Sequence, residues 1–263
     1  MKKTFSLLTL AAALAASVSI VGCSGSSSSS DDVIKIGVFE PLTGANGAGG
    51  ADEYDGIKLA NKLFPEVLGK KVELVVVDNK SDKVEAANAA MVLAQKEKVN
   101  AVLGSWGSSL SMAGGPIFAE AKIPAVAVSA TNPAVTKGNE YYFRVCFLDP
   151  FQGTVGAAYA FNELKAKKVA VIREVSNDYS VGLAKFFVDE FVKLSGDPAS
   201  IVATSDYNTG DQDFSAQLTN IKQFEPDAIF APGNYTESAL IIKQARDLGI
   251  TAKFIGGDTW DYN

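Results

Sequence analysis

The chain has 263 residues, with 24 basic and 30 acidic side chains, a net charge of -6 and 47% hydrophobic residues. An acidic chain of this kind is a poor match for the phosphate backbone, so we expect no nucleic acid partner. The sequence contains no histidine and only two cysteines, which excludes serine–histidine and cysteine–histidine catalysis and the usual zinc centres. We therefore predict no catalytic residues, no cofactor and no metal site.

The first 23 residues have the pattern of an export signal. Lys2 and Lys3 precede an apolar run over residues 5–21, and the run ends in the letters IVGC at Cys23. This ending resembles the lipobox of bacterial lipoproteins, so we predict a signal peptide over 1–23 with lipidation at Cys23. An uncleaved membrane anchor is the alternative, because the run approaches the length that crosses a bilayer. The serine-rich stretch 24–32 is typical of a flexible linker.

From residue 33 onward, short β-rich runs alternate with helix-like stretches. We expect strands at 33–39, 72–77, 101–103, 125–128, 141–147, 168–172, 201–204, 228–230 and 254–256. We expect helices after a glycine-rich loop at 44–50, over 83–96 and 110–121, after Asp149-Pro150, and over 181–193, 214–224 and 237–248. This alternation predicts an α/β fold with doubly wound parallel sheets flanked by helices.

The alternation starts afresh near residues 148–150, which divides the chain into two series. We predict two lobes, a first lobe over 33–148 and a second lobe over 149–263, with a ligand cleft between their strand ends. A dinucleotide could be suspected from Gly47 and Gly49. However, the third glycine of that fingerprint is replaced by Asp52, whose carboxylate would repel a pyrophosphate.

Hydroxyl side chains follow two neighbouring strands of the first lobe. Ser108 comes after the strand at 101–103, and Ser129 and Thr131 come after the strand at 125–128. In an open parallel sheet, ligands bind beyond the carboxyl ends of the strands, where helix N-termini present unpaired N–H groups. Such groups favour an anion, so we predict a carboxylate-binding corner here. The alternative is that these hydroxyls only cap helices.

Polar and aromatic residues also follow the strands of the second lobe. Tyr179, Tyr235 and Asp258 stand after the first, third and fourth strands of this series. Asp258 would place a carboxylate across the cleft from the hydroxyl corner, which is the polarity that a zwitterion needs. The alternatives are that the tyrosines lie in surface loops and that Asp258 caps a short turn.

The chain from Ile34 to Tyr262 resembles the periplasmic binding proteins of the leucine/isoleucine/valine type, the receptors of ABC importers. The matching stretches are PLTG at 41–44, GSWGSS at 104–109, SATNP at 129–133, YFRV at 142–145, QARDLG at 244–249 and GGD at 256–258. The resemblance implies the two-lobe type I fold of that family. Departures are a glycine near Gly49 where the family often has an aromatic residue, and a chain that stops early. We expect a truncated chain with an incomplete first lobe.

By the same resemblance, the ligand-binding residues are Trp106, Ser108, Ser129, Ala130, Thr131, Tyr179, Tyr235 and Asp258. The hydroxyl residues would bind the α-carboxylate of the ligand, and Asp258 would bind its α-ammonium group. The two tyrosines would line or cap the ligand. Trp106 would wall the side-chain pocket, although it could equally be an ordinary packed aromatic residue.

The resemblance implies a non-enzymatic, extracytoplasmic lipoprotein that captures a free amino acid, branched-chain or similar, and hands it to an ABC permease. Two alternatives remain open. The first is the same class of receptor for an amide, a urea or an aromatic acid. The second is a hydrolase that uses carboxylates alone; such chemistry needs two carboxylates in one cleft, whereas only Asp258 has a clear position there.

Overall fold

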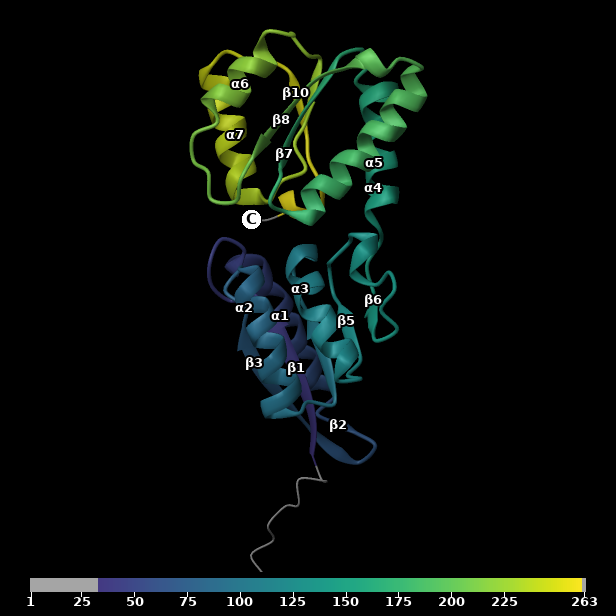
Figure 1. Cartoon of the computed structure of the whole chain (residues 1–263), viewed down its shortest axis with the longest axis vertical. Coiled ribbons are helices and arrows are strands. Elements are labelled where there is room, and N and C mark those ends of the chain that lie inside the picture. The colour runs from purple at the N-terminus through teal and green to yellow at the C-terminus, as the bar shows by residue number, and fades with distance from the viewer. Residues whose placement is uncertain (1–32, 262–263) are drawn as a thin grey trace, which may run out of the picture. The chain divides into compact units, whose positions relative to one another are not determined.

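A computed structural model describes residues 33–261. The predicted signal peptide, the lipidation site at Cys23 and the serine-rich linker lie outside these residues. The described chain forms two sheets, each built on parallel strands and flanked by helices (Figure 1). This confirms the predicted fold class. Within residues 33–261, every helix is too short or too polar to cross a bilayer.

The first sheet has the strand order β2-β3-β1-β4-β5-β6, and only the pairing of β2 with β3 is antiparallel. Its strands and helices, in chain order, are β1 (Val33–Glu40), α1 (Gly47–Leu63), β2 (Glu66–Val67), β3 (Lys70–Asp78), α2 (Lys83–Met91), β4 (Ala101–Gly104), α3 (Ser108–Glu120), β5 (Ala125–Ala127) and β6 (Tyr142–Arg144). A π-helical stretch (Val92–Glu97) extends α2, and a 3-10 helix (Pro133–Val135) follows β5.

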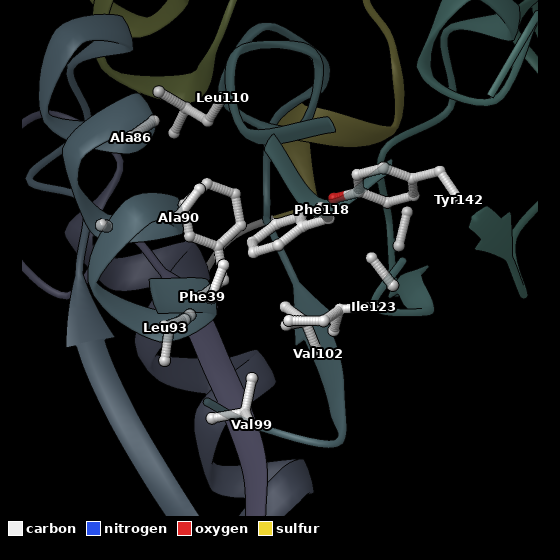
Figure 2. Packing of buried hydrophobic residues seen from close by; sticks show 14 of the residues in the cluster. Phe39, Ala86, Ala90, Leu93, Val99, Val102, Leu110, Phe118, Ile123 and Tyr142 are labelled. Carbon is white, nitrogen blue, oxygen red and sulfur yellow. The ribbon is translucent and has the colours of Figure 1, made fainter. Parts of the chain in front are cut away.

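The core of this sheet lies under α2 and α3. Alanines of α2 leave room for large side chains, and the rings of Phe39 and Phe118 meet edge to face with their centroids 5.4 Å apart (Figure 2). Tyr142 joins the same cluster from β6, and its hydroxyl donates to the Gly104 carbonyl at 2.7 Å. The buried phenol thus ties the edge strand to the end of β4.

The second sheet has the order β10-β9-β7-β8, and all its pairings are parallel. Its strands and helices are α4 (Asp149–Ala158), β7 (Val169–Glu174), α5 (Asp178–Ser195), β8 (Ile201–Tyr207), α6 (Ser215–Lys222), β9 (Ala228–Phe230), α7 (Tyr235–Asp247) and β10 (Lys253–Ile255). A π-helical stretch (Tyr159–Glu163) extends α4, and 3-10 helices occupy Pro198–Ser200 and Asp258–Trp260.

Helices cover both faces of the second sheet. Val169 and Val171 of β7 pack in the cluster that contains α4 and α5, whereas Ala170 and Ile172 pack in the cluster that contains α6 and α7. Alternate residues of a strand point to opposite faces, so a nearly continuous apolar run is what a strand covered on both sides requires. Stacking of Phe187 on Phe230, with centroids 3.9 Å apart, closes the first of these clusters.

Helices α1, α3, α5 and α7 begin two or more residues earlier than the sequence pattern predicts. The glycine-rich stretch is helical from Gly47. Glycine is needed at position 50 of this helix, because a Cβ there would stand 2.1 Å from the Pro41 carbonyl oxygen. Helix α5 begins at Asp178, because the Asn177 side chain accepts the N–H of Tyr179 and caps it. Tyr179, which we expected in a loop, therefore lies in the first turn of a helix.

Candidate ligand-binding site

A cavity of about 580 Å³ lies at the carboxyl ends of the parallel strands of both sheets. Its volume falls in the range of small-molecule sites. The lining residues, in chain order, are Asn46, Ser81, Asp82, Lys83, Trp106, Gly107, Ser108, Ser109, Leu110, Ser129, Thr131, Glu174, Ser176, Asn177, Tyr179, Thr209, Asn234, Asp258 and Thr259. Each of them ends a parallel strand or follows one, as expected for this kind of sheet.

Six of the eight predicted binding residues line this cavity: Trp106, Ser108, Ser129, Thr131, Tyr179 and Asp258. Ala130 does not; it packs in the core of the first sheet, and its carbonyl accepts a hydrogen bond from Arg144 at 2.7 Å. Tyr235 does not line the cavity either. Its hydroxyl donates to the Ala45 carbonyl at 3.1 Å, so it bridges the two lobes beside the site.

The first lobe contributes a donor wall, by which we mean the start of α3 together with Ser129 and Thr131. Within the described part of the chain, no side chain caps α3, and its first residues, Ser108 and Ser109, line the cavity. The first N–H groups of a helix lack partners within the helix and carry its positive dipole end. Ser108 Oγ accepts the N–H of Asn132 at 3.1 Å, which fixes the hydroxyl at the rim. This wall suits an anion.

The hydroxyl residues of the donor wall do not act as helix caps. Ser108 is the first residue inside α3, and Asn132, not Thr131, caps the short helix that follows β5, accepting the Ala134 N–H at 2.8 Å. The capping alternative raised by the sequence is therefore wrong for Ser108 and Thr131. Their hydroxyls remain at the cavity.

Two acidic side chains, Glu40 and Glu53, lie behind the donor wall. Burial, followed by the negative charge of Glu53, raises the pKa of Glu40 well above its usual value. Burial also raises the pKa of Glu53, while a hydrogen bond from Ser129 opposes that shift. Glu40 Oε2 accepts the N–H of Trp106 at 2.7 Å and so holds the loop after β4.

The second lobe contributes an acid wall, formed by Asp258 and the groups that hold it. Asp258 Oδ1 accepts the Tyr179 hydroxyl at 2.7 Å and the Gln152 side-chain amide at 2.9 Å. Burial, followed by the charge of Asp258, raises the pKa of Tyr179 well above its usual value, so the phenol keeps the proton that it donates. Asp258 thus presents a fixed carboxylate to the cavity, which suits a cation.

Direct contacts join the two lobes on either side of the cavity. On one side, Asp178 accepts Lys83 Nζ and the Ser109 hydroxyl, both at 2.9 Å, and its carbonyl accepts the Asn132 amide at 2.8 Å. On the other side, the buried Asn234 amide donates to Asn46 Oδ1 at 3.0 Å. These bonds join the two walls directly.

Trp106 forms an aromatic boundary of the cavity. Its ring meets Tyr235 edge to face with centroids 6.2 Å apart, and a Cβ at Gly49 would stand 2.6 Å from its indole nitrogen. The glycine at position 49, which we noted as a departure from the family pattern, therefore leaves the space that the indole occupies.

Several residues of the site escaped the sequence reasoning. Asn46, Lys83 and Glu174 line the cavity although no motif singled them out. Their common signal is position, since each ends a parallel strand or stands at a helix start that follows one. Gln152 was missed for another reason, because it reaches Asp258 across 106 residues of sequence.

Comparison with known proteins identifies a family for the chain. The model of a family described as periplasmic binding protein matches residues 33–263. A Pseudomonas aeruginosa protein named amino acid binding protein is 33% identical over 231 residues, which cover 86% of this chain and 60% of that protein.

Two crystal structures resemble the chain in sequence and in fold. A leucine binding protein, LivK, from Thermotoga maritima is 46% identical with a TM-score of 0.83, over 87% of this chain and 64% of that one. LivJ from Streptococcus pneumoniae, a branched-chain amino acid transporter substrate binding protein in complex with isoleucine, is 37% identical with a TM-score of 0.79, over 87% and 65%. The chain therefore spans 60–65% of the length of these relatives. It belongs to the periplasmic binding protein family, a family of binding proteins rather than enzymes.

Proposed function

We propose that this chain forms the ligand-binding part of an extracytoplasmic receptor that captures a free amino acid for an ABC importer, with a branched-chain or similar side chain. One observation carries the proposal: the uncapped start of α3 and the Asp258 carboxylate line the same cavity. A zwitterion is the ligand class whose two charges match these two walls.

The α-carboxylate would accept hydrogen bonds from the Ser108 hydroxyl and from the N–H groups at the start of α3. The α-ammonium group would donate to Asp258, whose Oδ1 already accepts two donors. Each charge-assisted bond contributes about 1.5–3 kcal/mol. Binding at both walls stabilises the arrangement in which the lobes are joined, so ligand affinity and closure are linked.

Two observations support an apolar ligand side chain. Trp106 and Leu110 provide apolar lining beside the donor wall. The two similar crystal structures are described as a leucine binding protein and as a complex with isoleucine. We therefore expect leucine, isoleucine or valine to be the preferred ligand.

Isothermal calorimetry of the protein with the twenty amino acids tests the proposal. We expect heat with the branched-chain amino acids. Binding should be much weaker with 4-methylpentanoate, which is leucine without its ammonium group, and with 3-methylbutylamine, which is leucine without its carboxylate. No heat with any amino acid, or binding of 4-methylpentanoate or benzoate in preference to leucine, would contradict it.

The tether is a further part of the proposal. We propose that lipid on Cys23 anchors the receptor at the outer face of a membrane, where it meets its permease; the lipobox-like ending of the leader supports this. Expression with a labelled fatty acid should give a labelled protein, and the Cys23→Ala variant should be unlabelled. Equal labelling of both proteins would contradict the anchor.

A further inference from the structure

Gln152 lies in the first turn of α4 and does not line the cavity. Its side chain nevertheless makes two hydrogen bonds to Asp258. Its Oε1 accepts the backbone N–H of Asp258 at 2.6 Å, and its Nε2 donates to Asp258 Oδ1 at 2.9 Å. A primary amide supplies an acceptor and a donor at once, so this ring of two bonds fixes both the backbone and the carboxylate of Asp258.

The groups around these two hydrogen bonds leave one oxygen of the Asp258 carboxylate available to the cavity. Oδ1 of Asp258 accepts a second bond, from the Tyr179 hydroxyl at 2.7 Å. Among residues 33–261, no donor bonds Oδ2. A Cβ at Gly257 would stand 2.1 Å from the Tyr179 hydroxyl oxygen and 3.1 Å from Gln152 Oε1, so the glycine leaves room for both partners.

The same helix start also contacts the donor wall. The Asp149 N–H donates to the Thr131 carbonyl at 3.1 Å, and Gln152 Nε2 lies 3.5 Å from Asp149 Oδ1. The first turn of α4 therefore touches the loop that carries Thr131 and holds the loop that carries Asp258. A substitution of Gln152 should therefore act mainly on the acid wall, because its two short hydrogen bonds are made to Asp258.

We propose that Gln152 is a positioning residue for ligand recognition, which orients the Asp258 carboxylate so that its free oxygen meets the ammonium group of the ligand. This inference rests on the proposed function. It predicts that Gln152 matters for ligands that carry an ammonium group and much less for ligands that lack one, although Gln152 itself contacts neither.

Gln152→Glu gives the sharpest test, because it keeps the shape and replaces the donor by a carboxylate. The titratable and charged groups near this side chain are Asp149, Asp258, Tyr179 and Arg144. At pH 8 the new carboxylate would repel Asp258, and we expect leucine affinity to fall about 10- to 100-fold relative to the unaltered protein. As pH falls toward 5, the protonated Glu side chain regains a donor, so the difference should shrink.

The matched control is Gln217→Glu, which makes the same change on α6, where the Gln217 amide donates to the Asp206 carbonyl at 3.1 Å away from the cavity. It should leave leucine affinity unchanged at every pH. Thermal unfolding of both variants and of Gln152→Ala checks the fold. Gln152→Ala should weaken leucine binding at all pH values without recovery.

The outcomes separate the inference from the proposed function. An unaltered protein that binds no amino acid overturns both. An unaltered protein that binds leucine, together with a Gln152→Glu variant that binds it equally well at pH 8, overturns the positioning role alone. So does a loss that is the same at pH 5 and pH 8, or a loss of 4-methylpentanoate affinity as large as that of leucine.

Discussion

The two walls of the cavity are built on different principles. The donor wall spreads its function over a helix start and several hydroxyl residues, whereas the acid wall concentrates it in Asp258. Backbone N–H groups stay in place when one side chain is removed, but a carboxylate has no substitute. Under the proposed function, the anion of the ligand would therefore be held redundantly and its cation would not.

The strongest test of this contrast is Asp258→Asn. The variant keeps the shape and an acceptor but loses the charge, so we expect leucine affinity to fall about 10- to 100-fold. Titration calorimetry measures this loss. The affinity for 4-methylpentanoate should stay the same or rise, because that ligand has no cation to pair. An equal loss for both ligands would show that Asp258 supports the fold of the site rather than the ammonium group.

A second test concerns Asp149, which lies between the walls. Burial, opposed by the Thr131 hydroxyl and reinforced by Asp258, raises the pKa of Asp149 to about 7 from 3.8. Between about pH 4 and pH 7 the unfolded chain loses this proton while the folded protein keeps it, so stability falls as pH rises and levels off above 7.

The Asp149→Asn variant has no proton to lose at this position. In urea unfolding, it should therefore gain stability relative to the unaltered protein by about 1–3 kcal/mol between pH 4.5 and pH 8. The buried Glu40, Glu53 and Glu174 also have raised pKa values, but they are present in both proteins and cancel in the difference. A constant difference across this pH range would contradict the account.

Ser108→Ala probes the redundancy of the donor wall. The substitution removes one neutral hydrogen bond and leaves the N–H groups of α3, so leucine affinity should fall only about 2- to 10-fold. The same calorimetry that measures Asp258→Asn makes the comparison direct. If Ser108→Ala costs as much as Asp258→Asn, the anion is held by one hydroxyl and the contrast between the walls is wrong.

The smallest expected effect is at the contact between the lobes. The Lys83 and Asp178 side chains are 50% and 43% exposed, so their ion pair contributes about 0.2–1 kcal/mol. Lys83→Met should weaken leucine binding about 2-fold, mainly through faster dissociation in stopped-flow measurements. The effect should disappear in an Asp178→Asn background and shrink at high salt. An effect that persists in that background would place Lys83 on the ligand instead.

Much of this arrangement follows from sequence pattern. Apolar runs such as 33–39 and 168–172 predicted the parallel strands, and polar residues after them predicted the cavity, because strand ends converge at one edge of each sheet. One difference lies in the loop that follows β5. Ser129 and Thr131 line the cavity, whereas Ala130 between them packs in the core.

The remaining features depend on contacts between residues that are far apart in the sequence, and local sequence patterns do not encode such contacts. Gln152 and Asp258 are far apart in sequence, as are Lys83 and Asp178, and only the packed lobes bring them together. Tyr235 is the first residue of α7, and its hydroxyl donates to the Ala45 carbonyl. This side chain, which we expected to line or cap the ligand, therefore joins the two lobes beside the cavity. Side-chain direction changes with each residue of a helical turn, so the residue at which a helix begins decides where such a side chain points.

A crystal structure of the protein with leucine tests the central claim most directly. The account predicts the leucine α-carboxylate at the start of α3, within hydrogen-bond distance of Ser108, and the α-ammonium group within hydrogen-bond distance of Asp258 Oδ2. A ligand bound with its ammonium group away from Asp258, or with its carboxylate outside the donor wall, would contradict it.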